Sequence, residues 1–146
     1  LAIIEYLEEQ HPQPALLPGT SAQRARIRAL ALAVACDIHP LGNLRVLKYL
    51  QASGLDGVQR QRWSQHWVTL GLDAVEQVLH REGSRGRCCF GDSPTLADCC
   101  LIPQVFNAER IGCDLRQLPI LQGIYAHCMT LEPFRRAAPA AQPDAE

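Results

Sequence analysis

The chain has 146 residues and a formal net charge of −1, with 47% hydrophobic and 20% charged residues. This composition excludes a chain that is disordered throughout and argues against a strongly basic nucleic-acid-binding protein. No uninterrupted apolar run reaches the roughly 18 residues that a membrane-spanning helix needs, so we expect neither a nucleic-acid nor a membrane partner. Only 5% of the residues are aromatic, and Leu, Ala, Val and Ile dominate the apolar content, which favours helices over sheets.

The first twenty residues predict a short helix followed by a linker. Leu1, Ile4 and Leu7 are spaced as on one face of a helix that ends near residue 10. Residues 11–20 (HPQPALLPGT) hold three prolines and a glycine, which cannot continue a helix. The sequence also starts inside this helix, without Met and without a signal peptide. We therefore expect sequence upstream of Leu1 and interpret residues 11–20 as an interdomain linker.

The next segment predicts helix with an interruption. Thr20 or Ser21 can cap its start. An apolar face then recurs every three or four residues up to Pro40 and resumes beyond it. Because proline breaks the helical hydrogen-bond ladder, the pattern fits either one kinked helix or two helices nearly end to end. The face comprises Ile27, Leu30, Val34, Ile38, Leu41, Leu44, Leu47 and Leu50.

A further helix is expected over residues 58–81. Trp63 and Trp67 near its start are most simply packing groups. Gly71 inside it costs about 1 kcal/mol relative to Ala, unless a close helix contact needs the space. A loop follows, with a short extended piece expected at residues 87–90. The apolar stripe of this helix comprises Val68, Leu72, Val75 and Leu79.

A Thr-x-x-Asp capping box at Thr95 and Asp98 predicts the start of the next helix. The carboxylate of Asp98 can bond the amide of Thr95, so we interpret Asp98 as structural and not catalytic. Pro103 within this helix predicts a kink. The last long helix is expected to start at Pro119, a favourable first-turn residue, and to be followed by a short turn near Pro133.

These elements together predict an all-α fold, because no useful run of alternating apolar and polar residues indicates a strand. Residues 21–138 are expected to form a bundle of four or five helices. The helix of residues 1–10 would be an addition in front of this bundle, and residues 139–146, rich in Ala and Pro, are expected to fray.

The seven cysteines do not follow a metal-binding pattern. There is no Cys-x-x-Cys pair, and the two vicinal pairs Cys88–Cys89 and Cys99–Cys100 have no histidine between them. Secreted domains held by disulfides are shorter and richer in cysteine. We expect seven reduced thiols, packed as small hydrophobic groups in a cytoplasmic protein, and no metal ion.

Three segments carry a resemblance to a known family, namely residues 37–47 (DIHPLGNLRVL), 91–111 (GDSPTLADCCLIPQVFNAERI) and 142–146 (QPDAE). They resemble the zeta class of glutathione transferases, which includes maleylacetoacetate isomerase and maleylpyruvate isomerase, and the resemblance extends over nearly the whole chain. It implies a glutathione transferase C-terminal-like helical bundle preceded by a thioredoxin-like domain, whose last helix would be residues 1–10. The family's thiol-activating residue would lie upstream of Leu1. We therefore expect no catalytic residue in this chain and no activity from this chain alone.

The resemblance also implies which residues bind glutathione, the expected cofactor. These are His39 and Asn43, which are four residues apart and would therefore share one helical face. The role implied for His39 is a hydrogen bond to the tripeptide and not proton transfer. From the residues alone, a histidine beside Pro40 could instead be a satisfied helix-end group, and Asn43 could equally be a surface side chain.

For the substrate, the resemblance implies a pocket with a cationic side chain. Arg110 can hold a carboxylate through two parallel hydrogen bonds, as guanidinium groups do. The alternative from the residues alone is a structural ion pair of Arg110 with Glu109 or Asp114. The complete set of expected substrate-binding residues is Arg110, Asn43, Gln104 and Asn107.

The implied activity is the glutathione-dependent cis–trans isomerisation of maleylacetoacetate to fumarylacetoacetate, in tyrosine and phenylalanine catabolism. The thiolate of glutathione would add to the cis double bond, permit rotation about the resulting single bond, and leave. The substrate would be a small dicarboxylic keto acid and the complete protein a homodimer. The alternatives are maleylpyruvate isomerase, a general glutathione transferase, and a non-catalytic glutathione transferase-like docking module.

Overall fold

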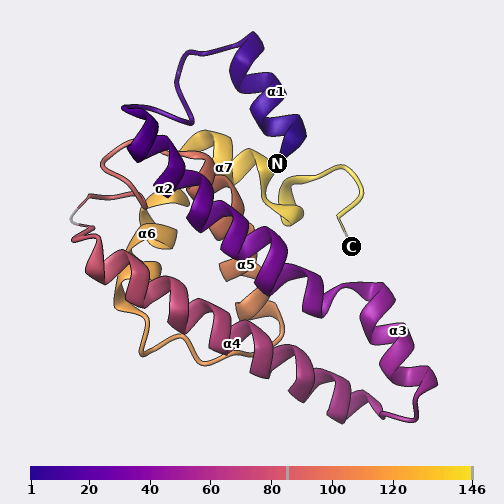
Figure 1. The fold of residues 1–146 in the computed structure, drawn as a ribbon. Coiled ribbons are helices and arrows are strands. Elements are labelled where there is room, and N and C mark those ends of the chain that lie inside the picture. The colour runs from indigo at the N-terminus through magenta and orange to yellow at the C-terminus, as the bar shows by residue number, and fades with distance from the viewer. Residues whose placement is uncertain (85, 146) are drawn as a thin grey trace.

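The computed structural model describes residues 1–84 and 86–145, and every regular element within these ranges is a helix (Figure 1). The single extended pairing in this part of the chain is an isolated antiparallel bridge between Cys88 and Gly91. The all-α expectation is confirmed, and the extended piece expected at 87–90 is reduced to this bridge. The elements are α1 (Ala2–Gln10), α2 (Ser21–Leu32), η1 (Ala33–Ile38), η2 (His39–Gly42), α3 (Leu44–Ala52), α4 (Gly57–Arg81), α5 (Leu96–Arg110), α6 (Pro119–Cys128), α7 (Glu132–Ala137) and η3 (Pro139–Ala141).

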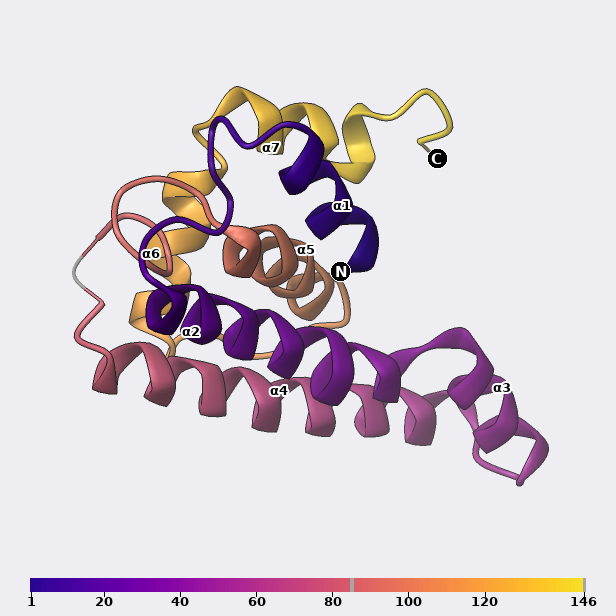
Figure 2. The same cartoon turned by 45° about the horizontal axis from the view of Figure 1, so that its top comes forward.

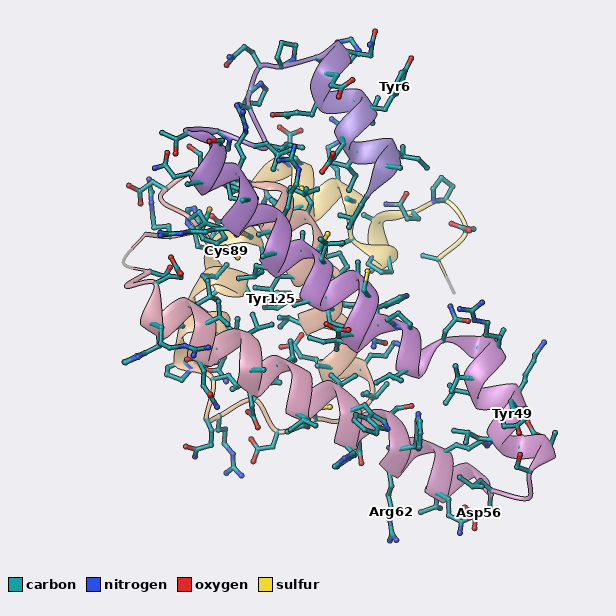
Figure 3. The ribbon with its side chains drawn as sticks, viewed as in Figure 1. Tyr6, Tyr49, Asp56, Arg62, Cys89 and Tyr125 are labelled. Carbon is teal, nitrogen blue, oxygen red and sulfur yellow. The ribbon has the colours of Figure 1, made fainter. Side chains whose placement is uncertain are left out.

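The core of the bundle lies where α2, η1, α4, α5 and α6 meet. α2 packs mainly on α5, whereas α4 contacts η1 and η2 (Figures 1 and 2). α3 and the first turns of α4 project beyond the other helices, with Tyr49 and Asp56 near the tip (Figure 3). The expected stripe of α4 is confirmed, since Val68, Leu72, Val75 and Leu79 are all at most 2% exposed.

Capping explains where three of the helices begin. The Thr20 hydroxyl accepts from the amide of Gln23 at 3.3 Å, and the Gln23 side chain accepts from the amide of Thr20 at 2.8 Å. Asp56 and Gln59 form the same reciprocal pair at the start of α4, with both distances 2.8 Å. At the start of α6, the side chain of the N-cap residue Leu118 forms no capping hydrogen bond. The cap comes from a side chain of another helix.

That distant cap is the carboxylate of Glu76 in α4. Its two oxygens accept from the amides of Ile120 and Leu121, each at 2.9 Å. Negative charge at a helix N-terminus is favoured by the helix dipole and by the free amides there. Glu76 therefore fixes the start of α6 against α4.

The helix that begins with α2 changes geometry before Pro40. Residues 33–38 form a π-helix, residues 39–42 a 3₁₀ turn, and Asn43 then adopts an extended conformation that starts α3. Of the two arrangements that the sequence allowed, the structure has two helices joined end to end. Ile27, Leu30, Val34 and Ile38 are at most 3% exposed. Beyond Pro40 the apolar face is only partly covered, since Leu44 is 64% exposed while Leu41, Leu47 and Leu50 are half-buried.

The glycine inside α4 is explained by a close helix contact. A Cβ atom at Gly71 would collide with the side chain of Ile38 in η1. This contact brings the π-helical segment against α4 and outweighs the intrinsic cost of glycine in a helix.

The helical segment of residues 21–52 also meets a length and composition test for a membrane span. Its best 18-residue window has a mean hydropathy of 1.3, and 22% of that window is buried. Such evidence is weak, because core helices of folded proteins meet the same test. Since Pro40 interrupts this segment and its buried face contacts α4 and α5, we interpret it as part of the bundle.

α1 and the linker are joined to the bundle by two acidic side chains. The Glu8 carboxylate accepts from the amides of Leu16 and Leu17 at 2.8 and 2.9 Å. Glu5 forms an ion pair of 2.7 Å with Arg28 of α2. At the other end of the chain, η3 forms a 3₁₀ turn, and the Gln142 side chain donates to the carbonyl of Arg136 at 2.7 Å. Glu146, the last residue of the tail expected to fray, lies outside the described residues.

Candidate functional site

His39 opens the 3₁₀ turn η2 and is exposed to solvent. Its Nδ1 atom lies 3.3 Å from Oε1 of Gln104, a residue of α5. The turn exists because Pro40 at its second position cannot continue the preceding hydrogen-bond ladder. His39 is therefore held at the junction of η2 and α5, with the rest of its ring available for a ligand.

Asn43 does not share a helical face with His39, and that expectation is wrong. The 3₁₀ turn ends at Gly42, and the extended backbone of Asn43 makes it the N-cap of α3. Its side-chain oxygen accepts from the amide of Arg45 at 3.1 Å. The i, i+4 argument required an unbroken helix through Pro40. Asn43 is exposed, so a ligand-binding role stays a prediction.

Arg110 is the last residue of α5 and is exposed. One guanidinium nitrogen donates to Oδ1 of Asn107 at 2.7 Å. Neither acidic side chain proposed as an alternative partner forms an ion pair with it in the described part of the chain. Asp114 instead pairs with Arg116 at 2.6 Å. The Arg116 guanidinium lowers the pKa of Asp114 to about 2 through this contact.

Glu109, the second acidic residue considered as a partner of Arg110, lies near Tyr125 of α6 and affects the pKa of its hydroxyl. Burial raises the pKa of Tyr125, and the charge and hydrogen bonding of Glu109 raise it further. The guanidinium of Arg110 thus donates to a neutral amide, and an anion could bind its other N–H groups. A cation at the C-terminal end of α5 is also favoured by the helix dipole.

Gln104 and Asn107 are less exposed than side chains that line an open pocket would be. Gln104 is only 2% exposed, and Asn107 is half-buried with its amide oxygen engaged by Arg110. Both therefore contact a residue expected to bind a ligand. A direct substrate contact for either one stays a prediction.

A cluster of thiols surrounds Asp98 in the core. The Sγ atoms of Cys88 and Cys128 and a carboxylate oxygen of Asp98 lie within 4.8 Å of one another, and all three residues are 0% exposed. Asp98 accepts from the Cys89 amide at 2.8 Å and from the amide and hydroxyl of Thr95 at 2.7 and 2.8 Å.

Burial raises the pKa of each thiol in this cluster, and the charge of Asp98 raises it further. The pKa of nearby Cys99 rises to about 11 for the same reasons. A raised pKa makes these thiols poor nucleophiles, because nucleophilic attack requires the thiolate. The cluster is best explained as core packing around the capping box.

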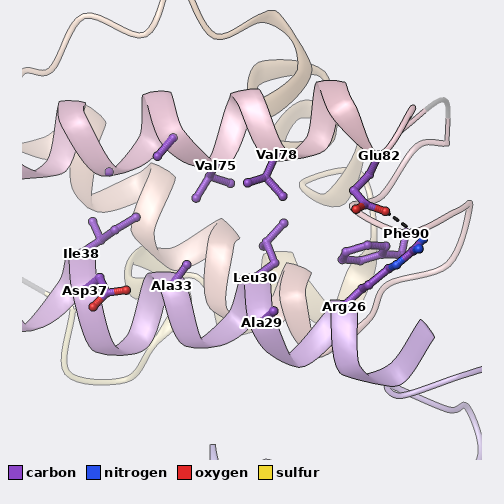
Figure 4. A pocket seen from close by; sticks show the side chains of 12 residues that line it. Arg26, Ala29, Leu30, Ala33, Asp37, Ile38, Val75, Val78, Glu82 and Phe90 are labelled. Carbon is purple, nitrogen blue, oxygen red and sulfur yellow. Dashed lines mark hydrogen bonds and ion pairs between the residues drawn. The ribbon is translucent and has the colours of Figure 1, made fainter. Parts of the chain in front are cut away.

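A largely apolar cavity is lined by neither His39 nor Arg110, although Asp37 and Ile38, which precede His39, form part of its wall. It has a volume of about 260 Å³ and lies between α4 and the segment formed by α2 and η1 (Figure 4). Its walls carry small side chains, including Ala29, Ala33 and Ala74. The ion pair of Arg26 with Glu82, 3.0 Å long, closes one end.

Three contacts around the site were not predicted from the sequence. The Asp56–Gln59 box was readable as Asp-x-x-Gln before an amphipathic helix. The pairing of His39 with Gln104 and the cap that Glu76 gives to α6 join residues 65 and 44 positions apart. No local pattern could have shown those two contacts.

Comparisons with known proteins identify the relatives of this chain. No protein-family model matches it. A maleylpyruvate isomerase of Ralstonia is 52% identical over 144 residues, which are 98% of this chain and 68% of that protein. The holo structure of a maleylpyruvate isomerase, a bacterial zeta-class glutathione transferase, superposes with a TM-score of 0.96 at 51% identity over 99% of this chain and 69% of its own.

A maleylacetoacetate isomerase of Anaeromyxobacter dehalogenans, with dicarboxyethyl glutathione and citrate in its active site, superposes with a TM-score of 0.94 at 45% identity. That match covers 99% of this chain and 64% of the other. The chain thus spans about two thirds of the length of its relatives. It belongs to the zeta-class glutathione transferase family of maleylacetoacetate and maleylpyruvate isomerases.

Proposed function

We propose that this chain is the helical, substrate-pocket part of a glutathione-dependent isomerase that converts maleylacetoacetate to fumarylacetoacetate. The observation that carries the proposal is the 52% identity to an isomerase over 98% of the chain, which includes the segments around His39 and Arg110. Related structures contain glutathione or a glutathione derivative in the active site. Glutathione is accordingly the cofactor of the proposed reaction.

The residues present fit this cofactor and a dicarboxylic keto acid in different ways. His39 offers one exposed ring nitrogen for a hydrogen bond to the tripeptide, and exposed Asn43 lies at the next helix start. Arg110 offers guanidinium donors not engaged by an acid in the described residues. The glutathione thiolate supplies the nucleophile that adds to the cis double bond and leaves after rotation. Arg110 holds a substrate carboxylate during this process.

We place the thiol-activating group outside this chain, in a thioredoxin-like domain of which α1 is the last helix. The buried thiols described above are held protonated, so they do not suit that task. In this division, residues 1–10 are the remnant of that domain, residues 11–20 the linker, and residues 21–138 the helical domain. The exposed apolar side chains of α1, Ile3 and Tyr6, are 75% and 61% exposed and offer a surface for it.

The test compares two forms of the protein. The protein expressed from its full coding sequence should isomerise maleylacetoacetate with glutathione, whereas the 146-residue chain should not. Turnover by the 146-residue chain at a comparable rate would place the thiol-activating group among the residues described here. A full-length protein without turnover that still binds partner proteins would support the docking module.

Maleylpyruvate is the second candidate substrate, because the Ralstonia relative is a maleylpyruvate isomerase. Both compounds present carboxylates to Arg110, so the charge of the pocket alone does not separate them. The ratio of kcat/KM for the two compounds decides between them.

We also propose that the complete protein is a homodimer and is cytoplasmic. The cavity between α2 and α4 is lined mainly by apolar side chains, and an accessible apolar surface is the kind of surface that a second copy could cover. Ala74 is exposed at this cavity. If a second copy packs there, Ala74→Glu should shift the sedimentation coefficient from dimer to monomer and leave the helix content unchanged. A dimer unaffected by this change would place the interface elsewhere.

A further inference from the structure

Gln104 is a polar residue in an otherwise apolar layer of α5. Its neighbours Leu101, Val105 and Ala108 are at most 1% exposed, and Gln104 itself is 2% exposed. Its Oε1 atom has one partner, Nδ1 of His39 at 3.3 Å. The amide therefore connects the core of the bundle to an exposed residue at the proposed glutathione site.

The nitrogen of the Gln104 amide has no hydrogen-bond partner within the described residues. Nε2 of Gln104 is buried and has no hydrogen-bond partner in residues 1–84 and 86–145. An unpaired buried donor is destabilising, and an apolar side chain of similar volume would avoid this cost. Packing alone therefore does not explain a glutamine at this position, and the bond to His39 remains as its role.

This bond has a definite consequence for the imidazole. A carbonyl oxygen can only accept, so Nδ1 of His39 must carry the hydrogen. The bond made by one ring nitrogen sets the state of the other. In the neutral ring, Nε2 is then an acceptor, and it is the ring nitrogen left for a ligand.

We propose that Gln104 is a positioning residue that fixes the rotamer and the Nδ1–H tautomer of His39, so that Nε2 faces glutathione as the binding atom. The inference rests on the proposed function, in which His39 contacts glutathione. Gln104 is buried, so it acts through His39 and does not touch the substrate. This assignment differs from the pocket-lining role that the resemblance implies for Gln104.

The decisive measurement is the tautomer of His39 in the 146-residue chain. Long-range ¹H–¹⁵N spectra of protein labelled at its five histidines distinguish the Nδ1–H from the Nε2–H form above the pH at which the ring titrates. His39→Asn assigns the signal. We expect wild-type His39 to be Nδ1–H. An Nε2–H ring in the wild type would overturn the proposal, because Gln104 would then present Nε2 to the ring.

Two variants supply matched controls. Gln104→Met keeps a similar volume but has no acceptor, so His39 should return to the Nε2–H form that free histidine favours in water. Gln104→Glu keeps the acceptor and should retain Nδ1–H. His11, His66, His80 and His127 should be unchanged in both. A His39 tautomer that is the same in Gln104→Met as in the wild type would also overturn the proposal.

Kinetics of the protein expressed from its full coding sequence separate this inference from the proposed function. Gln104→Met should raise KM for glutathione about two- to tenfold, the effect of one hydrogen bond, with little change in kcat. In the background of His39→Ala, Gln104→Met should add no further increase. A wild-type protein without glutathione-dependent turnover would contradict the proposed function, while the tautomer would still decide the role of Gln104.

Discussion

Arg110, proposed above to hold a substrate carboxylate, has a neutral partner. Its guanidinium is exposed at the end of α5 and is oriented by the amide of Asn107 rather than by a carboxylate. A neutral partner fixes the group without neutralising its charge. A substrate carboxylate can therefore bind without displacing an internal ion pair.

Replacement of Arg110 should accordingly affect catalysis more than stability. A charge-assisted hydrogen bond contributes about 1.5–3 kcal/mol, so Arg110→Ala should lower kcat/KM about ten- to a hundredfold. Arg110→Lys should recover only part of this, because an ammonium cannot form the two-bond contact. Steady-state kinetics and melting temperatures of both variants provide the measurement. Normal kinetics with a lower melting temperature would show that Arg110 is structural.

Asp98 is the opposite case, a charged residue that serves the fold. Its carboxylate is 0% exposed and accepts three hydrogen bonds, two from Thr95 and one from the Cys89 amide. It therefore joins the loop before α5 to the first turn of that helix. This is more than the capping box alone implied, because the bond to Cys89 was not visible in the sequence.

The two residues of the box should consequently differ in their effect on stability. Thr95→Ala should cost roughly 0.5–2 kcal/mol, as for a lost N-cap. Asp98→Ala leaves three buried donors without an acceptor and should cost about 3–5 kcal/mol. Urea denaturation of both variants gives the comparison. Equal losses would mean that the bonds from the amides of Cys89 and Thr95 to Asp98 contribute nothing.

At the level of elements, the helices and their apolar faces were predictable, and the junctions between them were not. The stripes of α2 and α4 follow from a spacing of three and four residues, and the box at Thr95 from its sequence. The π-helix at residues 33–38 ends at Ile38, whose side chain packs closely on Gly71 of α4, and neither feature has a local sequence pattern that predicts it.

The same reason explains what was missed at the candidate site. Asn43 was placed on a helical face because the pattern of apolar residues continues past Pro40. The backbone instead ends one helix and starts another at that point. The pairing of His39 with Gln104 depends on how η2 packs on α5, so it required the fold.

The cap that Glu76 gives to α6 provides a test of such a junction. Glu76→Ala removes the acceptor of two helix-start amides and should destabilise the protein by about 1–2 kcal/mol. Glu76→Gln keeps acceptor oxygen but not the charge and should lose less. Glu9→Ala, at an exposed position of α1, serves as the control. If Glu76→Ala unfolds at the same urea concentration as the wild type, α6 does not depend on this cap.

Across the whole molecule, the burial of the thiols predicts their reactivity. Cys36 is exposed, whereas Cys88, Cys89 and Cys128 are buried. Burial and the charge of Asp98 raise the pKa of each of the three buried thiols, so they remain protonated up to a higher pH than an ordinary cysteine. Their reaction with a thiol reagent should therefore require unfolding.

Titration with a chromogenic disulfide reagent measures this directly. At neutral pH the native protein should show one fast thiol, removed by Cys36→Ser, and the three buried thiols should not react. After denaturation without reductant, all seven should be counted. A total of three, or stoichiometric zinc in the purified protein, would contradict the interpretation of the cysteines as packing groups.

The helical bundle, the exposed guanidinium at the end of α5 and the similarity to zeta-class isomerases lead to one central claim, that the protein is a glutathione-dependent isomerase. The most direct test follows the isomerisation of maleylacetoacetate by the protein expressed from its full coding sequence, with and without glutathione. We predict turnover that requires catalytic amounts of glutathione, leaves glutathione unconsumed, and falls about ten- to a hundredfold in kcat/KM in Arg110→Ala. Turnover at the same rate without glutathione, or stoichiometric consumption of glutathione, would contradict the claim.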